Sequence, residues 1–123
     1  MYDCENFGQF VRTRRIEMKI SLRKFADSIS MSFSHWSDIE TGKKNPPKDE
    51  VLDLISQRLK LSENDKNTML TLVGLSRNSL APDVIDYVMD NIYLNDILRI
   101  AKANDFKKKD WFEFLEFINI RKG

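Results

Sequence analysis

SLRKFADSISMSFSHWSDIETG, residues 21–42, predicts two short helices joined by a tight turn. In the first half, apolar residues recur at the i, i+3, i+4, i+7 spacing of one buried helical face, from Leu22 to Ile29. A second helical pattern follows the interruption at residues 30–32, and Gly42 marks its end. Two helices in this arrangement predict a helix-turn-helix, whose second helix is held off the body so that it can enter the major groove of DNA.

The composition is typical of a soluble globular protein, with 41% hydrophobic and 32% charged residues among 123. No apolar run approaches the roughly 20 residues that a membrane-spanning helix needs, and residues 1–10 do not resemble a secretory signal. Cys4 is the single cysteine, which excludes an internal disulfide and a cysteine zinc cluster. We therefore expect a cytoplasmic protein without a membrane partner.

Basic residues gather on both sides of the expected helix-turn-helix, although the net charge is only +1. Six basic residues and one acid lie between Arg12 and Lys24, and Lys43, Lys44 and Lys48 follow the second helix. Local clusters that face phosphate contribute more to DNA affinity than the total charge does. Charge alone is equally compatible with a DNA-facing surface and with an ordinary solvated one.

The remaining sequence also predicts helices, and no segment alternates as a strand does. Five helices are expected in a first domain, residues 1–75, with the last of them stopped by Gly74. Residues 76–81 are expected to form a short linker, because the apolar spacing lapses there. Three more helices are expected in a C-terminal domain, residues 82–123, and Asp110 is expected to cap the last of them.

The last expected helix, WFEFLEFI at residues 111–118, is apolar around more of its circumference than a small domain normally buries. Either neighbouring helices cover both flanks, or part of this surface packs against a second copy of the chain. Groove-binding helix-turn-helix proteins usually bind two half-sites as two-fold dimers, which favours the second interpretation. We therefore expect a homodimer whose interface includes Trp111, Phe112, Leu115 and Phe117.

Residues 7–61 resemble the phage-repressor-like helix-turn-helix domain of the xenobiotic response element (XRE) family of transcriptional regulators. The ending I-E-x-G-x-x-x-P, at residues 39–46, is the most specific part of the match. The other matching residues are Phe10-Val11, Arg15-Ile16, Ser21-Leu22, Ala26, Met31-Ser32 and Thr41. The resemblance implies an all-α protein with a five-helix repressor-like domain, here followed by the small three-helix C-terminal domain. The C-terminal part loosely resembles helical tails of small regulators from Gram-positive bacteria and their mobile elements.

The resemblance also implies roles for single residues. The third helix would be the recognition helix, and the residues that would face or approach its DNA target are Phe33, Ser34, His35, Ser37 and Asp38. The residues that would grip phosphate are Ser21, Ser32, Lys43, Lys44 and Asn45. Arg15 and Glu40 would form a partly buried ion pair between the first helix and the end of the third.

The expected recognition helix departs from strong DNA readers because it holds no Arg, Lys, Gln or Asn, the best bidentate partners of guanine and adenine. Phe33 could contact a thymine methyl group, and Asp38 could accept from cytosine N4 but would repel nearby phosphate. Ser30 stands where the family usually has glycine, and a left-handed backbone there would cost a serine ~1 kcal/mol or more. These departures weaken the expectation of sharp base specificity, not that of the fold.

The expected function is a sequence-specific DNA-binding transcriptional regulator, a dimeric repressor that inserts its third helix into the major groove of double-stranded DNA. The alternative is a protein-binding module on the same fold, such as an antitoxin or a phage or mobile-element inhibitor, which would bind a protein partner and, secondarily, an operator. We expect no enzyme, cofactor or metal site. The single histidine lies on the presumed DNA face, and the sequence has neither a phosphate-binding glycine loop nor metal-ligand spacing.

Overall fold

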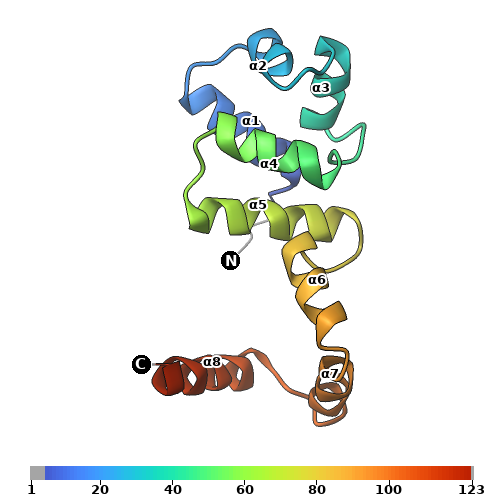
Figure 1. Cartoon of the computed structure of the whole chain (residues 1–123), viewed down its shortest axis with the longest axis vertical. Coiled ribbons are helices and arrows are strands. Elements are labelled where there is room, and N and C mark those ends of the chain that lie inside the picture. Colours follow the sequence, from blue (N-terminus) through green and yellow to red (C-terminus); the bar gives the residue numbers. More distant parts are fainter. Residues whose placement is uncertain (1–4, 123) are drawn as a thin grey trace. The chain divides into compact units, whose positions relative to one another are not determined.

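The computed structural model describes residues 5–122, which form helices and turns without any strand (Figure 1). This confirms the predicted all-α fold. The helices are α1 Phe7–Glu17, α2 Leu22–Ser28, α3 Phe33–Glu40, α4 Asp49–Arg58, α5 Glu63–Ser76, α6 Pro82–Asp90, α7 Leu94–Ala103 and α8 Lys108–Lys122. Cys4, on which the disulfide and zinc predictions rest, lies outside the described residues. None of the helices described is long and apolar enough to cross a membrane.

The chain divides into two compact units, Met1–Ile85 and Asp86–Gly123, and the division falls within α6. The first unit contains α1 to α5 and therefore the whole helix-turn-helix. The stretch for which a linker is predicted, residues 76–81, includes the last residue of α5 and the turn that leads to α6.

The first unit is built on one hydrophobic core to which all five of its helices contribute. Phe25 of α2 and Trp36 of α3 are both fully buried, and their ring centroids lie 5.0 Å apart. α3 packs against α2 and α1, and α1 also packs against α5. Burial of each such aromatic side chain removes about 150–250 Å² from water, so this pair contributes much of the stability of the motif. Ile39 of α3 is buried in the same core as Trp36.

Short polar side chains cap the starts of several helices. The hydroxyl of Ser21 accepts a hydrogen bond from the backbone N–H of Lys24, and that of Ser62 accepts one from Asp65, each at 3.1 Å. These bonds satisfy backbone donors that the first helical turn leaves free. Asn6 caps α1 in the same way, as part of a reciprocal capping box that the sequence analysis does not anticipate.

The prediction that Gly74 ends the fifth helix is wrong, because α5 continues to Ser76. Gly74 is buried inside the helix, and a Cβ atom at this position would lie only 2.6 Å from the carbonyl oxygen of Leu80. The glycine is therefore explained by the close approach of the chain that follows α5. It does not act as a helix stop.

The predicted cap of the last helix is also wrong. α8 begins at Lys108, so Asp110 lies inside its first turn. The Asp110 carboxylate accepts a hydrogen bond from the backbone N–H of Lys107 at 2.9 Å. Asp110 is thus the third residue of α8, and its carboxylate binds the backbone N–H of the residue before the helix. The residue at this position of a capping box makes the same bond.

Ser30 adopts a left-handed backbone with φ of 56°, at the position where the family usually has glycine. We expect Ser30→Gly to raise the free energy of unfolding by about 0.5–1 kcal/mol, since glycine reaches this conformation without steric cost. Urea denaturation measures the change. Ser28→Gly is the matched control, because Ser28 lies in α2 and glycine should lower the stability there. Equal stability of Ser30→Gly and the wild type would contradict this account.

The second unit buries little of its own apolar surface. Ala101 is its single buried residue among those described. Phe106, Trp111 and Phe114 meet edge to face, with ring centroids 5.1 and 6.1 Å apart for the successive pairs. With Ile97 and Ile100 of α7, they line an open apolar hollow of about 230 Å³. The unit thus has an aromatic cluster without an enclosed core.

Candidate nucleic-acid interface

The recognition helix expected from the sequence, α3, has two chemically different faces. Trp36, Ile39 and Glu40 are buried against the core of the first unit. On the other side, Phe33, Ser34 and His35 are exposed, while Ser37 and Asp38 are half-buried. In Figure 1, α3 lies with α2 at one edge of this unit. The residues expected to face DNA are therefore all accessible.

An ion pair fixes the end of α3 to α1. The Arg15 guanidinium donates to both carboxylate oxygens of Glu40, from Nε at 2.7 Å and from Nη2 at 2.9 Å. The indole Nε1 of Trp36 donates to the same carboxylate at 2.6 Å, and Arg15 Nη1 donates to the carbonyl of Ile20 at 2.8 Å. The two charges are buried, but their hydrogen-bonding groups are well satisfied, which is the condition under which a buried pair is tolerated.

A glycine in α1 allows this helix to touch the end of α3. A Cβ atom on Gly8 would lie 2.5 Å from the carbonyl oxygen of Glu40 and 2.6 Å from that of Ile39. Such distances are far below van der Waals contact, so the two backbones could not remain where they are. Gly8 is a structural residue of the interface that the sequence analysis misses.

We expect Gly8→Ala to lower the free energy of unfolding by about 1–3 kcal/mol, because α1 and α3 must move apart. The loss should appear although alanine favours helix over glycine by about 1 kcal/mol. Thermal and urea unfolding measure it. Thr13→Ala, at an exposed position of α1, should leave the stability nearly unchanged and is the matched control. A Gly8→Ala protein as stable as the wild type would refute the close contact.

The loop after α3 carries the predicted phosphate contacts Lys43, Lys44 and Asn45, all of which are exposed. Gly42 makes the turn possible with φ of 83°, a conformation that glycine adopts without strain. The backbone N–H of Lys44 donates to the carbonyl of Asp38 at 3.1 Å, so the loop folds back on the helix. The three polar side chains therefore start from a defined backbone.

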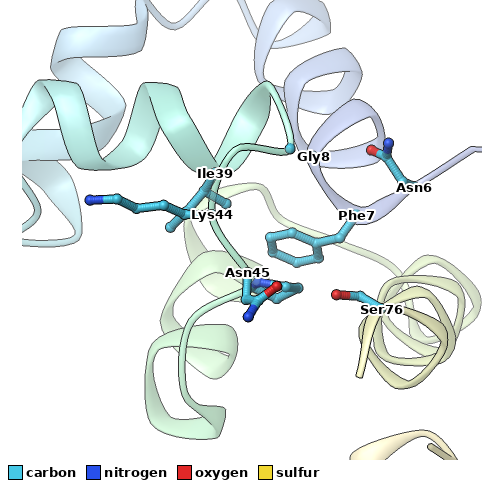
Figure 2. A pocket seen from close by; sticks show the side chains of 9 residues that line it. Asn6, Phe7, Gly8, Ile39, Lys44, Asn45 and Ser76 are labelled. Carbon is cyan, nitrogen blue, oxygen red and sulfur yellow. The ribbon is translucent and has the colours of Figure 1, made fainter. Parts of the chain in front are cut away.

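A small hollow of about 130 Å³ lies behind this loop (Figure 2). The start of α1 forms one side of it and the loop forms another. Figure 2 shows the Phe7 ring directed into the hollow and the Lys44 side chain extending away from it. Asn45 and Ser76 stand at its border. The ammonium group of Lys44 is thus available on the outer side of the loop, where a phosphate could reach it.

Two of the predicted contact residues pair with each other. Lys44 Nζ lies 3.9 Å from Asp38 Oδ2, and both side chains are substantially exposed. An exposed pair at this distance contributes about 0–1 kcal/mol, so it can be exchanged for another partner at little cost. A phosphate could therefore replace Asp38 as the partner of Lys44.

The serines predicted to contact phosphate also cap helices. The hydroxyl of Ser32 accepts from the backbone N–H of His35 at 3.2 Å, as that of Ser21 does from Lys24. Because a hydroxyl both accepts and donates, the proton of each remains able to donate to a phosphate oxygen.

Arg23 is a further residue of this surface that the sequence analysis does not assign. Its Cζ atom lies 4.6 Å from the centroid of the Phe33 ring, and both residues are exposed. The sequence includes Arg23 in a basic run but gives no sign of this contact. The contact depends on how the turn brings the starts of α2 and α3 together.

Comparisons with known proteins bear on the same region. Residues 6–69 match a family model described as a helix-turn-helix domain. No curated protein sequence is significantly similar to the chain. Among solved structures, the chain is similar to a chain of the SinR protein/SinI protein complex, with 24% sequence identity and a TM-score of 0.47. That alignment covers 94% of this chain and 97% of the other.

Proposed function

This chain belongs to the helix-turn-helix domain family, and from that premise we propose that it is a repressor that binds a short palindromic DNA site as a homodimer. The family match confirms the predicted resemblance to XRE-type regulators and makes the chain a DNA-binding regulator. The proposal adds that the protein works in the cytoplasm without catalysing a reaction. It also adds that α3 occupies the major groove, which is wide enough to admit a helix.

The observation that supports groove insertion is the two-sided construction of α3. Its buried side is held by Trp36, Ile39 and the Glu40 ion pair, so the helix has a fixed position in the unit. Its other side offers small or flat groups, including Ser34, that do not obstruct a base edge. The exposed lysine loop follows directly, at the place where a helix in the groove is flanked by the phosphate backbone.

Selection of bound sites from random duplex DNA tests this proposal. We expect an enriched palindrome whose half-sites are centred ~10 bp, or one helical turn, apart. The selection should be repeated at two salt concentrations, since phosphate contacts make the affinity strongly salt-dependent. Recovery of unenriched sequences at both concentrations would contradict sequence-specific repression.

The exposed aromatic surface of α8 supports the dimer. The predicted interface residues Trp111, Phe112, Leu115 and Phe117 are between 38% and 57% exposed. The apolar surface of the second unit continues on α7, where Ile97, Leu98 and Ile100 are also exposed. A stable interface buries about 800 Å² on each partner, and exposed apolar patches of a few hundred Å² commonly mark such contacts. Packing of this surface against the same surface of a second copy would remove the aromatic cluster of each copy from water.

We expect Leu115→Ala combined with Phe117→Ala to weaken dimerisation at least about 1000-fold, since each truncated side chain at an interface centre costs about 1–2 kcal/mol and a homodimer loses two copies of each. Sedimentation equilibrium measures the dissociation constant. Glu113→Ala combined with Glu116→Ala, on the same helix, is the matched control and should leave it unchanged. A wild-type protein that sediments as a monomer at micromolar concentration would overturn the dimer proposal.

The same apolar surface also supports a second candidate function, a module that binds a different protein. An antitoxin or a phage or mobile-element inhibitor would use α8 against its partner and bind an operator only secondarily. Purification from the native host distinguishes the two. A stable heteromer favours the second function, whereas a homodimer that retards a fragment of its own promoter favours the repressor.

A further inference from the structure

Arg23 and Phe33 form an exposed pair at the start of the recognition helix. Arg23 is the second residue of α2 and Phe33 the first of α3. The guanidinium lies over the aromatic ring with Cζ 4.6 Å from the centroid, and 43% of Phe33 is exposed. Of the carboxylates in residues 5–122, none lies within ion-pair distance of Arg23. The ring therefore holds the guanidinium at a surface where no described acid competes for it.

This contact leaves the hydrogen-bonding capacity of the arginine unused. A guanidinium attracts an aromatic face through its own flat face, while its N–H donors point outward in the plane of the group. The fork of donors that matches guanine O6 and N7 is therefore free. Because the ring restricts the long side chain, less conformational freedom is lost when the fork binds.

The pair also supplies what α3 lacks. None of the α3 side chains offers a bidentate base contact, and Asp38, its one acidic base-facing candidate, already lies near Lys44. Phe33 has a ring edge that can contact the methyl group of thymine. Neighbouring bases of one strand are separated by a rise of ~3.4 Å. Two exposed side chains in contact, such as Arg23 and Phe33, can therefore reach two neighbouring base pairs.

We propose that Arg23 and Phe33 together read a thymine next to a guanine in each half-site. Arg23 donates two hydrogen bonds to O6 and N7 of the guanine, and Phe33 packs against the C5 methyl group of the adjacent thymine. This inference rests on the proposed insertion of α3 into the major groove and names the bases that the insertion recognises. It assigns the main base specificity to Arg23 of α2, which contacts Phe33 of α3.

Base analogues in the selected site test each contact separately. Replacing the guanine by 7-deazaguanine removes the N7 acceptor, and replacing the thymine by uracil removes only the methyl group. We expect the wild type to lose about tenfold in affinity with the first and about fourfold with the second. The Arg23→Ala protein should not respond to 7-deazaguanine, and Phe33→Ala should not respond to uracil. Variants that keep the wild-type responses would overturn the proposal.

Arg23→Lys separates base reading from simple attraction to phosphate. Lysine keeps the positive charge but lacks the planar fork, so we expect its preference for guanine to fall about tenfold while its affinity for unrelated DNA stays the same. Lys24→Ala, at the next exposed position of α2, is the matched control and should weaken all sequences alike. An Arg23→Lys protein with unchanged guanine preference would show that the planar fork of Arg23 is not needed, and the inference would be wrong.

The outcomes also separate this inference from the function on which it rests. A wild type that selects a palindrome without a thymine–guanine step would overturn the Arg23–Phe33 assignment and leave the repressor proposal intact. A wild type that selects no site would overturn both. Since Arg23 and Phe33 are exposed, circular dichroism melting curves should show that their variants fold as the wild type does.

Discussion

Replacing Glu40 by alanine should lower the free energy of unfolding by about 3–5 kcal/mol. This loss is larger than the one expected for Gly8→Ala. The Glu40 side chain is only 2% exposed and accepts two hydrogen bonds from Arg15 and one from Trp36. Alanine removes the carboxylate but leaves the Arg15 charge and the Trp36 N–H buried. Stranding a buried charge and a buried donor costs more than the lost pair contributes.

Asp38→Ala is the matched control for this prediction, since it removes another carboxylate from the same helix. Asp38 is half-buried and pairs with Lys44 at 3.9 Å, so its loss should cost less than about 1 kcal/mol. Urea denaturation, followed by tryptophan fluorescence, compares the two proteins directly. Equal midpoints for Glu40→Ala and Asp38→Ala would show that the Arg15–Glu40 pair does not stabilise the fold.

Reversing the charge of Lys43 and Lys44 together, by substitution with glutamate, should weaken DNA binding at least about 100-fold near 0.1 M salt. Both lysines lie in the exposed loop after α3, where each can meet a phosphate. In place of two attractions the variant has two repulsions, and the new acid at position 44 also faces Asp38. The loss should be uniform across sequences, since phosphate contacts carry no base information.

The salt dependence gives a second measure of the same change. Each phosphate contact contributes about 0.9 to the slope of log affinity against log salt, so the slope should fall by about 2 for each protomer. Lys60→Glu combined with Lys66→Glu changes the net charge equally, in the connection of α4 to α5 and at the start of α5, and is the control. If both double variants lost the same affinity, overall charge would explain the binding and the docking of the loop would be refuted.

The helix-turn-helix is predictable from sequence because its signals are local. Leu22 to Ile29 repeat with the helical period, and Ser21 and Ser32 are natural caps that accept from backbone donors three residues on. Gly42 supplies the positive φ that ends α3. Each signal can be recognised within one or two helical turns, without knowing what packs against the segment.

The features that sequence reasoning misses depend on segments distant in the chain or on ambiguous chemistry. The role of Gly8 arises from the carbonyls of α3, and that of Gly74 from the backbone at Leu80. Asp110 is equally suitable as the first cap of a helix or as a residue of its first turn, so its type does not fix the start of α8. Arg15 and Glu40 are 25 residues apart, and only the family resemblance, not their spacing, relates them.

The separation of α3 into a buried face and an accessible face has an evolutionary consequence. Its orientation is set from within by Trp36, Ile39 and Glu40, whereas the outward side chains, such as Ser34 and His35, contribute little to the packing. Mutations at the outward positions can therefore accumulate without unfolding the protein. If the chain binds DNA as proposed, its descendants could acquire new binding sites one substitution at a time and keep the same scaffold.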